Sequence, residues 1–524
     1  MLYKVIDKHK IMNIKDIISD KITYDALTIM IPEKQTIMMY RVSKEIHDYL
    51  HSVKLGIHVK ISKFCNKFPD ISILLHKLEE LNKNISIRSI SFTGYHFEGV
   101  TGEAIIKELF NDRHCTISNG ESRSSNTGCT ISNRDSRSSN TGCTITSLDF
   151  SYNNLDVNAR HTIAEALFAN TTLKDLVLRN IELEKSEGYE IIDALRNNKT
   201  ITSLDIGKNN EDVSENYYTD DDYEEYEEVF TNIEKYLIAI ANMIKENSTI
   251  VKLNLEKNCL GDFGIYEIAD ALRYGTQEIV NALCMNTTIT TLNLDNNYIG
   301  KYGIHELANA LRVNTTITNL NLSRNYLREY GTQEIADVLY TNTTITTLNL
   351  SSNSLGKNGS LIIAELLYVN TTLRSLDLSH NYLRRHSFCS EIGIIAIANA
   401  LCKNNTITEL NLEHNKIGLN GALELSKALC VNKTIKILNL EHNKLRERGA
   451  CAIAEALCVN TTLQCLNLNN NKLEKYEVHA IINALCNNNT ITSLHLVCNE
   501  LGKNERKEVR DALCKNHTLT EFFV

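Results

Sequence analysis

The sequence repeats itself, and this repeat limits what the chain can fold into. In residues 286–314 the skeleton consists of Ile289, Leu292, Leu294, Asn297 and Ile299. The pattern returns 28 residues later and then along the array, in units that begin at Ile317, Ile345, Leu373, Ile407, Ile435, Leu463 and Ile491. Earlier units begin at Ile145, Leu173, Ile201 and Ile250. A repeat of this length predicts a solenoid, because one unit cannot bury its apolar face without its neighbours.

Each unit contains one short strand and one helix. Leu292 and Leu294 lie two residues apart, which places both on one face of a strand. The following apolar residues have helical spacing, namely Ile304, Leu307, Ala308 and Leu311. The sequence therefore predicts an α/β fold in which strands and helices alternate.

The repeat resembles a known family. Residues 449–473, GACAIAEALCVNTTLQCLNLNNNKL, are similar to the leucine-rich repeat of the ribonuclease-inhibitor type, which also occurs in NOD-like receptors and in the Ran GTPase-activating protein. The resemblance implies a horseshoe with an inner parallel β-sheet, outer helices and a concave face that binds protein. We expect this solenoid to span residues 84–524 in about 13 repeats.

Two columns of asparagines recur in register. The first, which we call the asparagine ladder, follows each strand, and we expect its side chains to bond to backbone groups of their own and the neighbouring coil. Its members are Asn153, Asn209, Asn258, Asn297, Asn325, Asn353, Asn381, Asn415, Asn443, Asn471 and Asn499. The second column, the cap asparagines, precedes each strand by three residues. These are Asn170, Asn198, Asn247, Asn286, Asn314, Asn342, Asn370, Asn404, Asn432, Asn460, Asn488 and Asn516.

The position of the cap asparagines directly after a helix predicts a left-handed backbone there, which asparagine tolerates. Several cap asparagines also form N-x-Thr glycosylation sequons, an alternative that we disfavour because no secretory signal is found.

Two further columns contain residues that bind metals elsewhere. Six cysteines each follow the last leucine of a helix, at Cys284, Cys402, Cys430, Cys458, Cys486 and Cys514. With no close C-x-x-C pair they are a poor zinc geometry, and we expect half-buried apolar thiols. His380, His414 and His442 lie on successive repeats beside Glu413 and Glu441. They form a weak metal candidate, for which duplication of a solvated turn is the favoured explanation.

Insertions interrupt the period outside the strands. Residues 115–142 contain a tandem duplication, CTISNGESRSSNTG and CTISNRDSRSSNTG, whose low apolar content predicts a disordered loop, with one degenerate repeat as the alternative. Residues 211–230 form an acidic insert with ten acidic residues and no basic one. A helix over 233–245 follows it, a second helix copy precedes Ile289, and extra residues lie around 384–390. Solenoids accept insertions in such places.

The first 83 residues lie outside the repeat. Apolar spacing predicts helices over residues 14–18, 24–31, 36–50 and 71–81, and a strand over 84–92 then opens the array. Residues 16–50 resemble an F-box, above all where Val42-Ser43-Lys44 precedes Ile46, although the usual Leu-Pro opening is absent. The resemblance implies docking of a Skp1-like adaptor through residues 16–50. A small helical cap is the alternative.

Charge and composition exclude other classes. The net charge of -9 is local, because without the ten acids of residues 211–230 the remainder is near +1 (-9 plus 10). No basic stripe indicates nucleic-acid binding, and no apolar run predicts a secretory signal or a membrane span. The 15 cysteines, an odd number, indicate reduced thiols in the cytoplasm, with the nucleus as an alternative. Abundant Asn, Ile, Lys and Tyr suggest a parasite, protist or large virus, in which case the host cytoplasm is expected.

No catalytic pattern is found. Residues 355–360 lack the P-loop spacing, and His305-Glu306 lacks the second histidine of H-E-x-x-H, so we predict no enzyme activity, cofactor or metal. We predict a scaffold that binds a protein partner on the concave face or the inserts, and the acidic insert favours a basic partner. The candidate binding residues are Asn254, Glu256, Asn293, Asp295, Asn321, Asn349, Asp377, Asn411, Glu413, Asn439, Glu441 and Asn467. Alternatives are an F-box-type adaptor of a ubiquitin ligase and a GTPase-activating or enzyme-inhibiting regulator.

Overall fold

A computed structural model describes most of the repeat array and short pieces before it. The described residues are 26–30, 56–62, 87–93, 96–97, 103, 106, 109, 145–184, 188–209, 223–260, 281–383, 391–514 and 516–524. The chain divides into two compact units. The first unit contains residues 1–181 and 197–204, and the second contains residues 182–196 and 205–524.

The first unit is built on parallel strands. Its sheet has the order β1 (Ala26–Met30), β2 (Gly56–Ser62), β3 (Ile87–Thr93), β5 (Ser147–Asp149), β7 (Asp175–Val177) and β8 (Ser203–Asp205). A separate pair joins β4 (His96–Phe97) to β6 (Asn154–Leu155), and α5 (Val157–Ala169) follows β6. Asp156 caps α5, because its Oδ1 accepts a hydrogen bond from the backbone N–H of Ala159 over 2.7 Å.

The strand predicted to open the array is present as β3. The helix predicted over residues 24–31 is wrong, because Ala26–Met30 is a strand that pairs in parallel with β2. Apolar residues in so short a run fit both periods, since Leu27 and Ile29 are two apart while Leu27 and Ile31 are four apart. The other three predicted helices, the Ser-rich loop 115–142 and the segment 384–390 lie outside the described residues.

The second unit alternates strands and helices. Its strands are β9 (Lys252–Asn254), β10 (Thr291–Asn293), β11 (Asn319–Asn321), β12 (Thr347–Asn349), β13 (Ser375–Asp377), β14 (Glu409–Asn411), β15 (Ile437–Asn439), β16 (Cys465–Asn467), β17 (Ser493–His495) and β18 (Glu521–Phe523). Its helices are α6 (Gly188–Asn197), α7 (Tyr223–Glu246), α9 (Lys301–Val313), α10 (Arg328–Leu339), α11 (Gly356–Val369), α12 (Ile392–Leu401), α13 (Gly418–Val431), α14 (Arg446–Leu457), α15 (Lys475–Leu485) and α16 (Lys503–Leu513).

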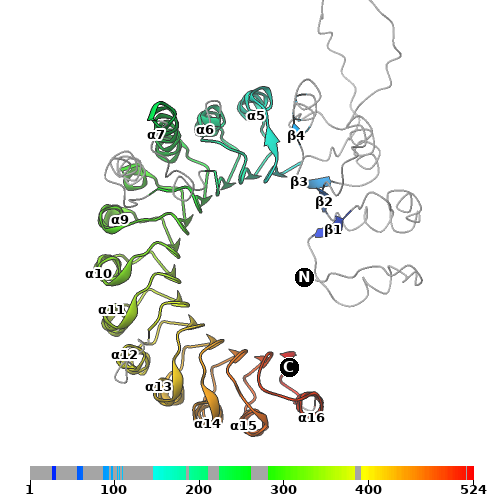
Figure 1. The fold of residues 1–524 in the computed structure, drawn as a ribbon, viewed down its shortest axis with the longest axis vertical. Coiled ribbons are helices and arrows are strands. Elements are labelled where there is room, and N and C mark those ends of the chain that lie inside the picture. The colour runs from blue at the N-terminus through cyan, green and yellow to red at the C-terminus, as the bar shows by residue number, and fades with distance from the viewer. Residues whose placement is uncertain are drawn as a thin grey trace, which may run out of the picture. The chain divides into compact units, whose positions relative to one another are not determined.

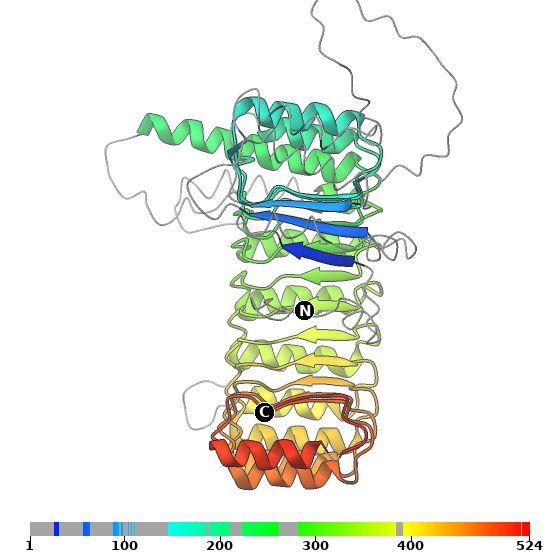
Figure 2. The same ribbon diagram turned by 90° about the vertical axis from the view of Figure 1, so that its right-hand side faces the viewer.

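Within this unit the strands line the inner side of a curve and the helices the outer side (Figure 1). The strands run in parallel from β9 to β18, so their C-terminal ends share one edge (Figure 2). The predicted α/β solenoid is therefore confirmed.

The core lies between the strand and helix layers. The middle residue of each strand is directed into it, and Leu292, Leu320 and Leu348 pair in register with exposed fractions of only 1–2%. From the helix layer, Ile304, Leu307, Ala308 and Leu311 are equally buried. A three-residue strand is not stable alone, so its pairing with both neighbours and this shared core hold it in place.

The asparagine ladder connects consecutive repeats. Asn297 is fully buried, and its Nδ2 donates to the carbonyl oxygen of Leu255 over 2.8 Å. Its Oδ1 accepts from the backbone N–H of Asn258, also over 2.8 Å. Asn325 repeats this arrangement one unit later, where it bonds to the oxygen of Leu294 and the N–H of Asn297. Because both partners lie in the preceding repeat, the ladder satisfies coil groups that no strand or helix reaches.

The cap asparagines are structural, but their predicted left-handed backbone is wrong. Asn314 and Asn432 are extended, with φ of -70° and -67°. In Asn432, Oδ1 accepts from the N–H groups of Thr434 and Ile435, and Nδ2 donates to the oxygen of Leu401 over 2.8 Å. An extended backbone is required because the chain turns directly from helix into strand. Asn432 is only 3% exposed, so a glycan at its nitrogen would have to displace these bonds.

The helix after the acidic insert begins earlier than predicted. α7 starts at Tyr223 and therefore includes the second half of the segment 211–230. Tyr236 of this helix is fully buried, and its hydroxyl group lies 3.1 Å from Oδ1 of the ladder residue Asn258. Burial, followed by the charge of Glu184, raises the pKa of Tyr236 well above its usual value.

Candidate interaction surface

The predicted binding residues in the strands support the backbone. Each is the last residue of its strand, and its Oδ1 accepts the N–H of the residue two positions later. In Asn293 this bond to Asp295 is 3.0 Å long, and in Asp377 the bond to Ser379 is 2.8 Å long. The same bond occurs at Asn254, Asn321, Asn349, Asn411, Asn439 and Asn467. These side chains terminate the strand as an Asx turn does, and their binding role stays a prediction.

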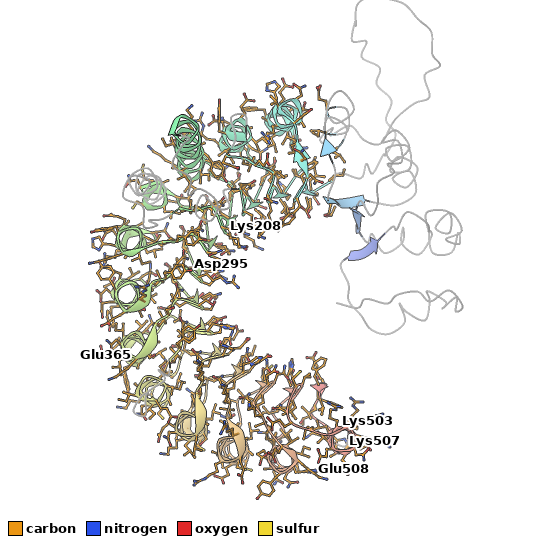
Figure 3. All side chains as sticks on the ribbon, viewed as in Figure 1. Lys208, Asp295, Glu365, Lys503, Lys507 and Glu508 are labelled. Carbon is orange, nitrogen blue, oxygen red and sulfur yellow. The ribbon has the colours of Figure 1, made fainter. Side chains whose placement is uncertain are left out.

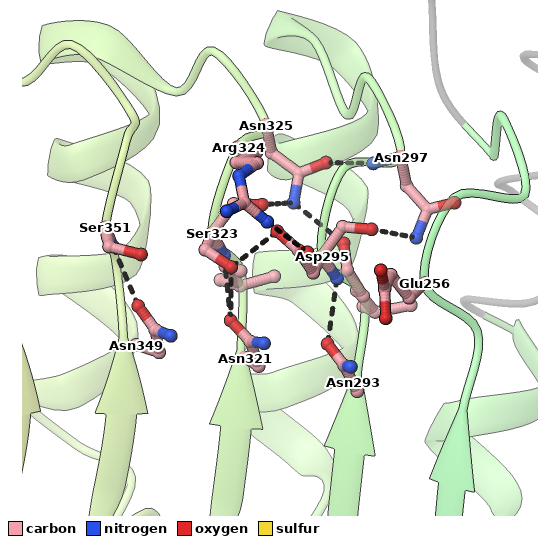
Figure 4. A network of polar contacts seen from close by, with 12 residues as sticks. Glu256, Asn293, Asp295, Asn297, Asn321, Ser323, Arg324, Asn325, Asn349 and Ser351 are labelled. Atoms are coloured by element: carbon pink, nitrogen blue, oxygen red, sulfur yellow. Dashed lines mark hydrogen bonds and ion pairs between the residues drawn. The ribbon is translucent and has the colours of Figure 1, made fainter. Parts of the chain in front are cut away.

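Asp295 is held inside the repeat array. It is only 5% exposed, and it lies on the inner side of the second unit, whereas Glu365 lies on the outer side (Figure 3). Its Oδ1 accepts from the hydroxyl group of Ser323 over 2.6 Å, and its Oδ2 lies 2.9 Å from Nη1 of Arg324 (Figure 4). Both partners come from the next repeat. The Asp295 carboxylate is therefore already neutralised, while 60% of the Arg324 side chain stays exposed.

Two other predicted carboxylates bond to amides of the next repeat. Oε2 of Glu413 accepts from Nδ2 of Asn439 over 3.2 Å. Glu441 accepts from Nδ2 of Asn467 over 3.0 Å and of Asn470 over 2.8 Å. Burial alone would raise the pKa of Glu441, but these amide bonds outweigh it and lower the pKa below its usual value. Glu256, the remaining predicted carboxylate, is half-buried directly after β9.

Left-handed residues flank the ladder on both sides. Around Asn325, Arg324 and Tyr326 have φ of 55° and 54°, and around Asn415, His414 and Lys416 have φ of 53° and 55°. This conformation turns the chain sharply while the ladder side chain stays inside. The flanking side chains therefore lie at the edge formed by the C-terminal ends of the strands. We call this edge of the second unit the coil edge.

Three histidines lie side by side along the coil edge. The rings of His380 and His414 are stacked, with centroids 4.6 Å apart and an interplanar angle of 19°. The rings of His414 and His442 are tilted at 58°, with centroids 5.4 Å apart. Nε2 of His380 lies 3.6 Å from Oε1 of Glu413. Burial, then the neighbouring rings of His380 and His442, lower the pKa of His414 below its usual value. Among the described residues, no cluster of three or more His, Cys, Asp or Glu side chains can hold a metal ion.

Tyrosines on the coil edge were not among the binding residues predicted from the sequence. The rings of Tyr298 and Tyr326 stack at 6.2 Å, and Nζ of Lys416 lies 5.4 Å from the ring centroid of Tyr382. Tyr326 and Tyr382 are each 52% exposed. The prediction from the sequence concerned the strand face, which has almost no aromatic side chains. The signal was present in the sequence, since all three tyrosines directly follow a ladder asparagine.

The cysteine column is more exposed than predicted. Five of its six members are exposed, and only Cys430 is half-buried. Partial burial raises the pKa of Cys284 and Cys402. These thiols are therefore less reactive than a free cysteine, since the thiolate is the nucleophile.

No helix among the described residues is long and apolar enough to cross a membrane. No disulfide joins two cysteines within the described part of the chain.

Comparisons with known proteins agree with this geometry. A family model described as a leucine-rich repeat matches residues 246–269, 341–359, 369–383, 403–426 and 431–454, so the chain carries leucine-rich repeats. No curated protein matches the sequence.

Three solved structures illustrate the similarity. The leucine-rich repeat-containing protein LegL7 from Legionella pneumophila is 18% identical over 67% of this chain and 92% of its own, with a TM-score of 0.39. The actin-binding site 2 of leiomodin-1 is 25% identical over 27% of this chain and 81% of its own, with a TM-score of 0.24. The tropomodulin C-terminal domain from Caenorhabditis elegans is 17% identical over 29% of this chain and 90% of its own, with a TM-score of 0.25.

Proposed function

We propose that this protein is a non-catalytic scaffold whose leucine-rich repeats bind a protein partner at the coil edge and the adjoining strand ends of the second unit. The observation that carries the proposal is the exposure of Arg324, Tyr326 and Tyr382 along one edge. Tyrosine and arginine supply most of the binding energy in protein interfaces. The amide groups of strand-end asparagines such as Asn293, Asn321 and Asn349 contribute polar contacts around these anchors. Those of Asn411, Asn439 and Asn467 are already bonded to Asp377, Glu413 and Glu441.

The F-box hypothesis is not favoured. Residues 16–50 would have to form helices, but Ala26–Met30 is a strand paired with β2. The hypothesis predicts that the full chain co-purifies with a Skp1-like adaptor, and that deleting residues 16–50 abolishes this association. The GTPase-activator alternative rests on the family resemblance alone, and the described residues add no observation in its favour. A basic partner attracted by residues 211–230 also remains a proposal, because residues 210–222 lie outside the described part.

Site-specific photo-crosslinking tests the proposed surface. A photoreactive amino acid replaces Tyr326 at the coil edge, Asn321 at the strand end, or Glu365 on the outer side of α11. In extracts of the native host we expect the same protein to crosslink at Tyr326 and Asn321, and none at Glu365. Crosslinking at Glu365 alone, or an equal background at all three positions, contradicts the proposed surface.

A further inference from the structure

Lys208, Lys257 and Lys472 flank ladder asparagines on the coil edge of the second unit, and six further cations flank the ladder between β11 and β16. They are Arg324, His380, His414, Lys416, His442 and Lys444, and we call this set the basic edge. All six have left-handed backbones, with φ between 53° and 56°. Each lies directly beside a ladder asparagine, so the ladder fixes their spacing from repeat to repeat. Arg324, His380, His442 and Lys444 are exposed, and His414 and Lys416 are half-buried.

The acidic groups nearest to these cations are already engaged within the array. Asp295 is buried against Ser323 and Arg324. Glu413 accepts a hydrogen bond from Asn439, and Glu441 accepts bonds from Asn467 and Asn470. A carboxylate that accepts such bonds is oriented toward its donors. Glu413 and Glu441 keep their negative charge, and Asp295 and Glu413 pair with Arg324 and His380. The positive charge that this edge presents to a partner therefore comes from Lys416, Lys444 and the histidines once they are protonated.

The basic edge changes its charge with pH. Arg324, Lys416 and Lys444 are charged at neutral pH, whereas histidines gain their charge near pH 6.5. Around His414 the charged or titratable neighbours are His380, His442, Glu413 and Lys416. Burial opposes protonation of His414 most strongly, the positive charges of His380, His442 and Lys416 add to this effect, and Glu413 favours protonation. An anion bound across the stack would offset that repulsion, so anion binding and proton uptake favour each other.

We propose, on the basis of the scaffold function above, that the basic edge binds an acidic segment of its protein partner and holds it more tightly as the pH falls. Charge complementarity selects an anion, and the exposed rings of Tyr326 and Tyr382 supply apolar contacts beside it. A polypeptide places its carboxylates only opposite the cations. A nucleic acid carries a charge on every nucleotide and would meet Glu413 and Glu441 as well, which disfavours it.

A direct binding measurement tests this inference. The probe is a fluorescein-labelled peptide of alternating Glu and Gly, titrated with the full chain at low salt and followed by fluorescence anisotropy. The double variant Lys416→Glu/Lys444→Glu should bind it on the order of tenfold more weakly than the wild type. The matched control Lys503→Glu/Lys507→Glu makes the same charge change on α16, where both lysines are exposed (Figure 3), and should lie within about twofold of the wild type.

The same titration at two pH values tests the contribution of the histidines. Between about pH 7.5 and about pH 5.5 the wild type should bind the Glu-Gly peptide several-fold more tightly at the lower pH. The triple variant His380→Gln/His414→Gln/His442→Gln should lose this response while it still binds at the higher pH. Circular dichroism establishes that each variant is folded before it is compared.

Four results overturn the inference. If the double variants on the basic edge and on α16 weaken peptide binding equally, the peptide is attracted by overall charge and not by a specific site. If the pH dependence of peptide binding is unchanged in the triple variant, the histidines do not cause it. Binding of an oligothymidine probe that exceeds that of the Glu-Gly peptide and is lost in the edge variant assigns the edge to nucleic acid. If the folded wild type does not bind the peptide although Tyr326 still crosslinks to a protein, the scaffold function stands and the acidic partner is wrong.

Discussion

Asparagines at three positions of the repeat bond to backbone groups that neither strand nor helix satisfies. The ladder and cap asparagines reach the preceding repeat, as Asn297 does to Leu255 and Asn432 to Leu401. The strand-end asparagines bond two residues ahead in their own coil, as Asn293 does to Asp295. An amide suits all three positions, since it donates and accepts at once. This use explains why asparagines are so frequent on a face that was expected to serve recognition.

Loss of one ladder side chain tests this explanation. Asn353 is fully buried and donates to the oxygens of Leu322, Leu350 and Ser351 while it accepts from the N–H of Asn325. In Asn353→Ala these groups lose their partner without gaining water, so we expect the free energy of unfolding to fall by about 3 kcal/mol. Urea denaturation followed by circular dichroism measures it. The control Ser354→Ala alters the exposed neighbour and should change stability by less than about 0.5 kcal/mol; equal effects would refute the role of the ladder.

Protonation of His414 should weaken the fold. Because its pKa is lowered in the folded state, the unfolded chain takes up this proton at a higher pH, near 6.5. As the pH falls from that value to the folded pKa, the unfolded state binds more protons and stability decreases. In His414→Gln the urea midpoint should therefore fall less between about pH 7.5 and about pH 5. In the control His517→Gln, which replaces an exposed histidine, the urea midpoint should change with pH as it does in the wild type. If the urea midpoint of His414→Gln also keeps the wild-type pH dependence, the effect assigned to the neighbouring histidines is wrong.

Adjacent helices approach one another closely at glycines. Gly393 of α12 leaves room for Ser360 of α11, which is fully buried and bonds to the oxygen of Gly356. Gly449 of α14 occupies the equivalent position against Ala422 of α13. The clearance is smaller at Gly393. Parallel strands at a fixed separation bring adjacent helices into this contact. The size of side chain that fits at the glycine position therefore depends on the residue that the neighbouring helix places against it.

The two glycines should respond differently to alanine. A Cβ atom at Gly393 would lie 2.6 Å from Cβ of Ser360 and 3.1 Å from the oxygen of Leu383. We expect Gly393→Ala to destabilise by about 2 kcal/mol, since overpacking exceeds the gain in helix propensity. At Gly449 the nearest atom, Cβ of Ala422, is 3.0 Å away, and a small shift relieves it. The free energy of unfolding of Gly449→Ala should stay within about 1 kcal/mol of the wild type. Thermal unfolding of both variants measures the difference. A larger loss of stability in Gly449→Ala than in Gly393→Ala would contradict the packing described above.

At the scale of the whole molecule, the repeats tolerate additions outside the strand. α7 is the longest described helix and begins inside the acidic insert, while β8 and β9 keep the three-residue length of the regular units. The strands of the second unit all have three residues, and those from β10 to β17 each pair with two others. A change in the length of a strand would shift every Leu–Leu pair of the register.

Two deletions separate the insert from the fold. Removing residues 211–222 should leave the far-ultraviolet circular dichroism and the urea midpoint unchanged, because this acidic stretch has little apolar surface to bury. Extending the deletion through residue 230 also removes the first turns of α7 and should lower the helical signal. If the shorter deletion unfolds the protein, residues 211–222 contribute to its stability. If the longer deletion leaves the circular dichroism unchanged, the first turns of α7 do not contribute to the helical signal.

The sequence alone determined the strand–helix alternation, the buried leucine columns and the asparagine ladder, because the local period of apolar residues records which side chains face the core. Tertiary structure decided what depends on the adjacent repeat. It showed that Asn293 and its equivalents support the backbone, that cap asparagines such as Asn432 are extended, and that Ala26–Met30 forms a strand. It also aligned His380, His414 and His442 with Tyr326 and Tyr382 on one edge. Residues 28 or more positions apart meet there, and no local pattern specifies the distance between them.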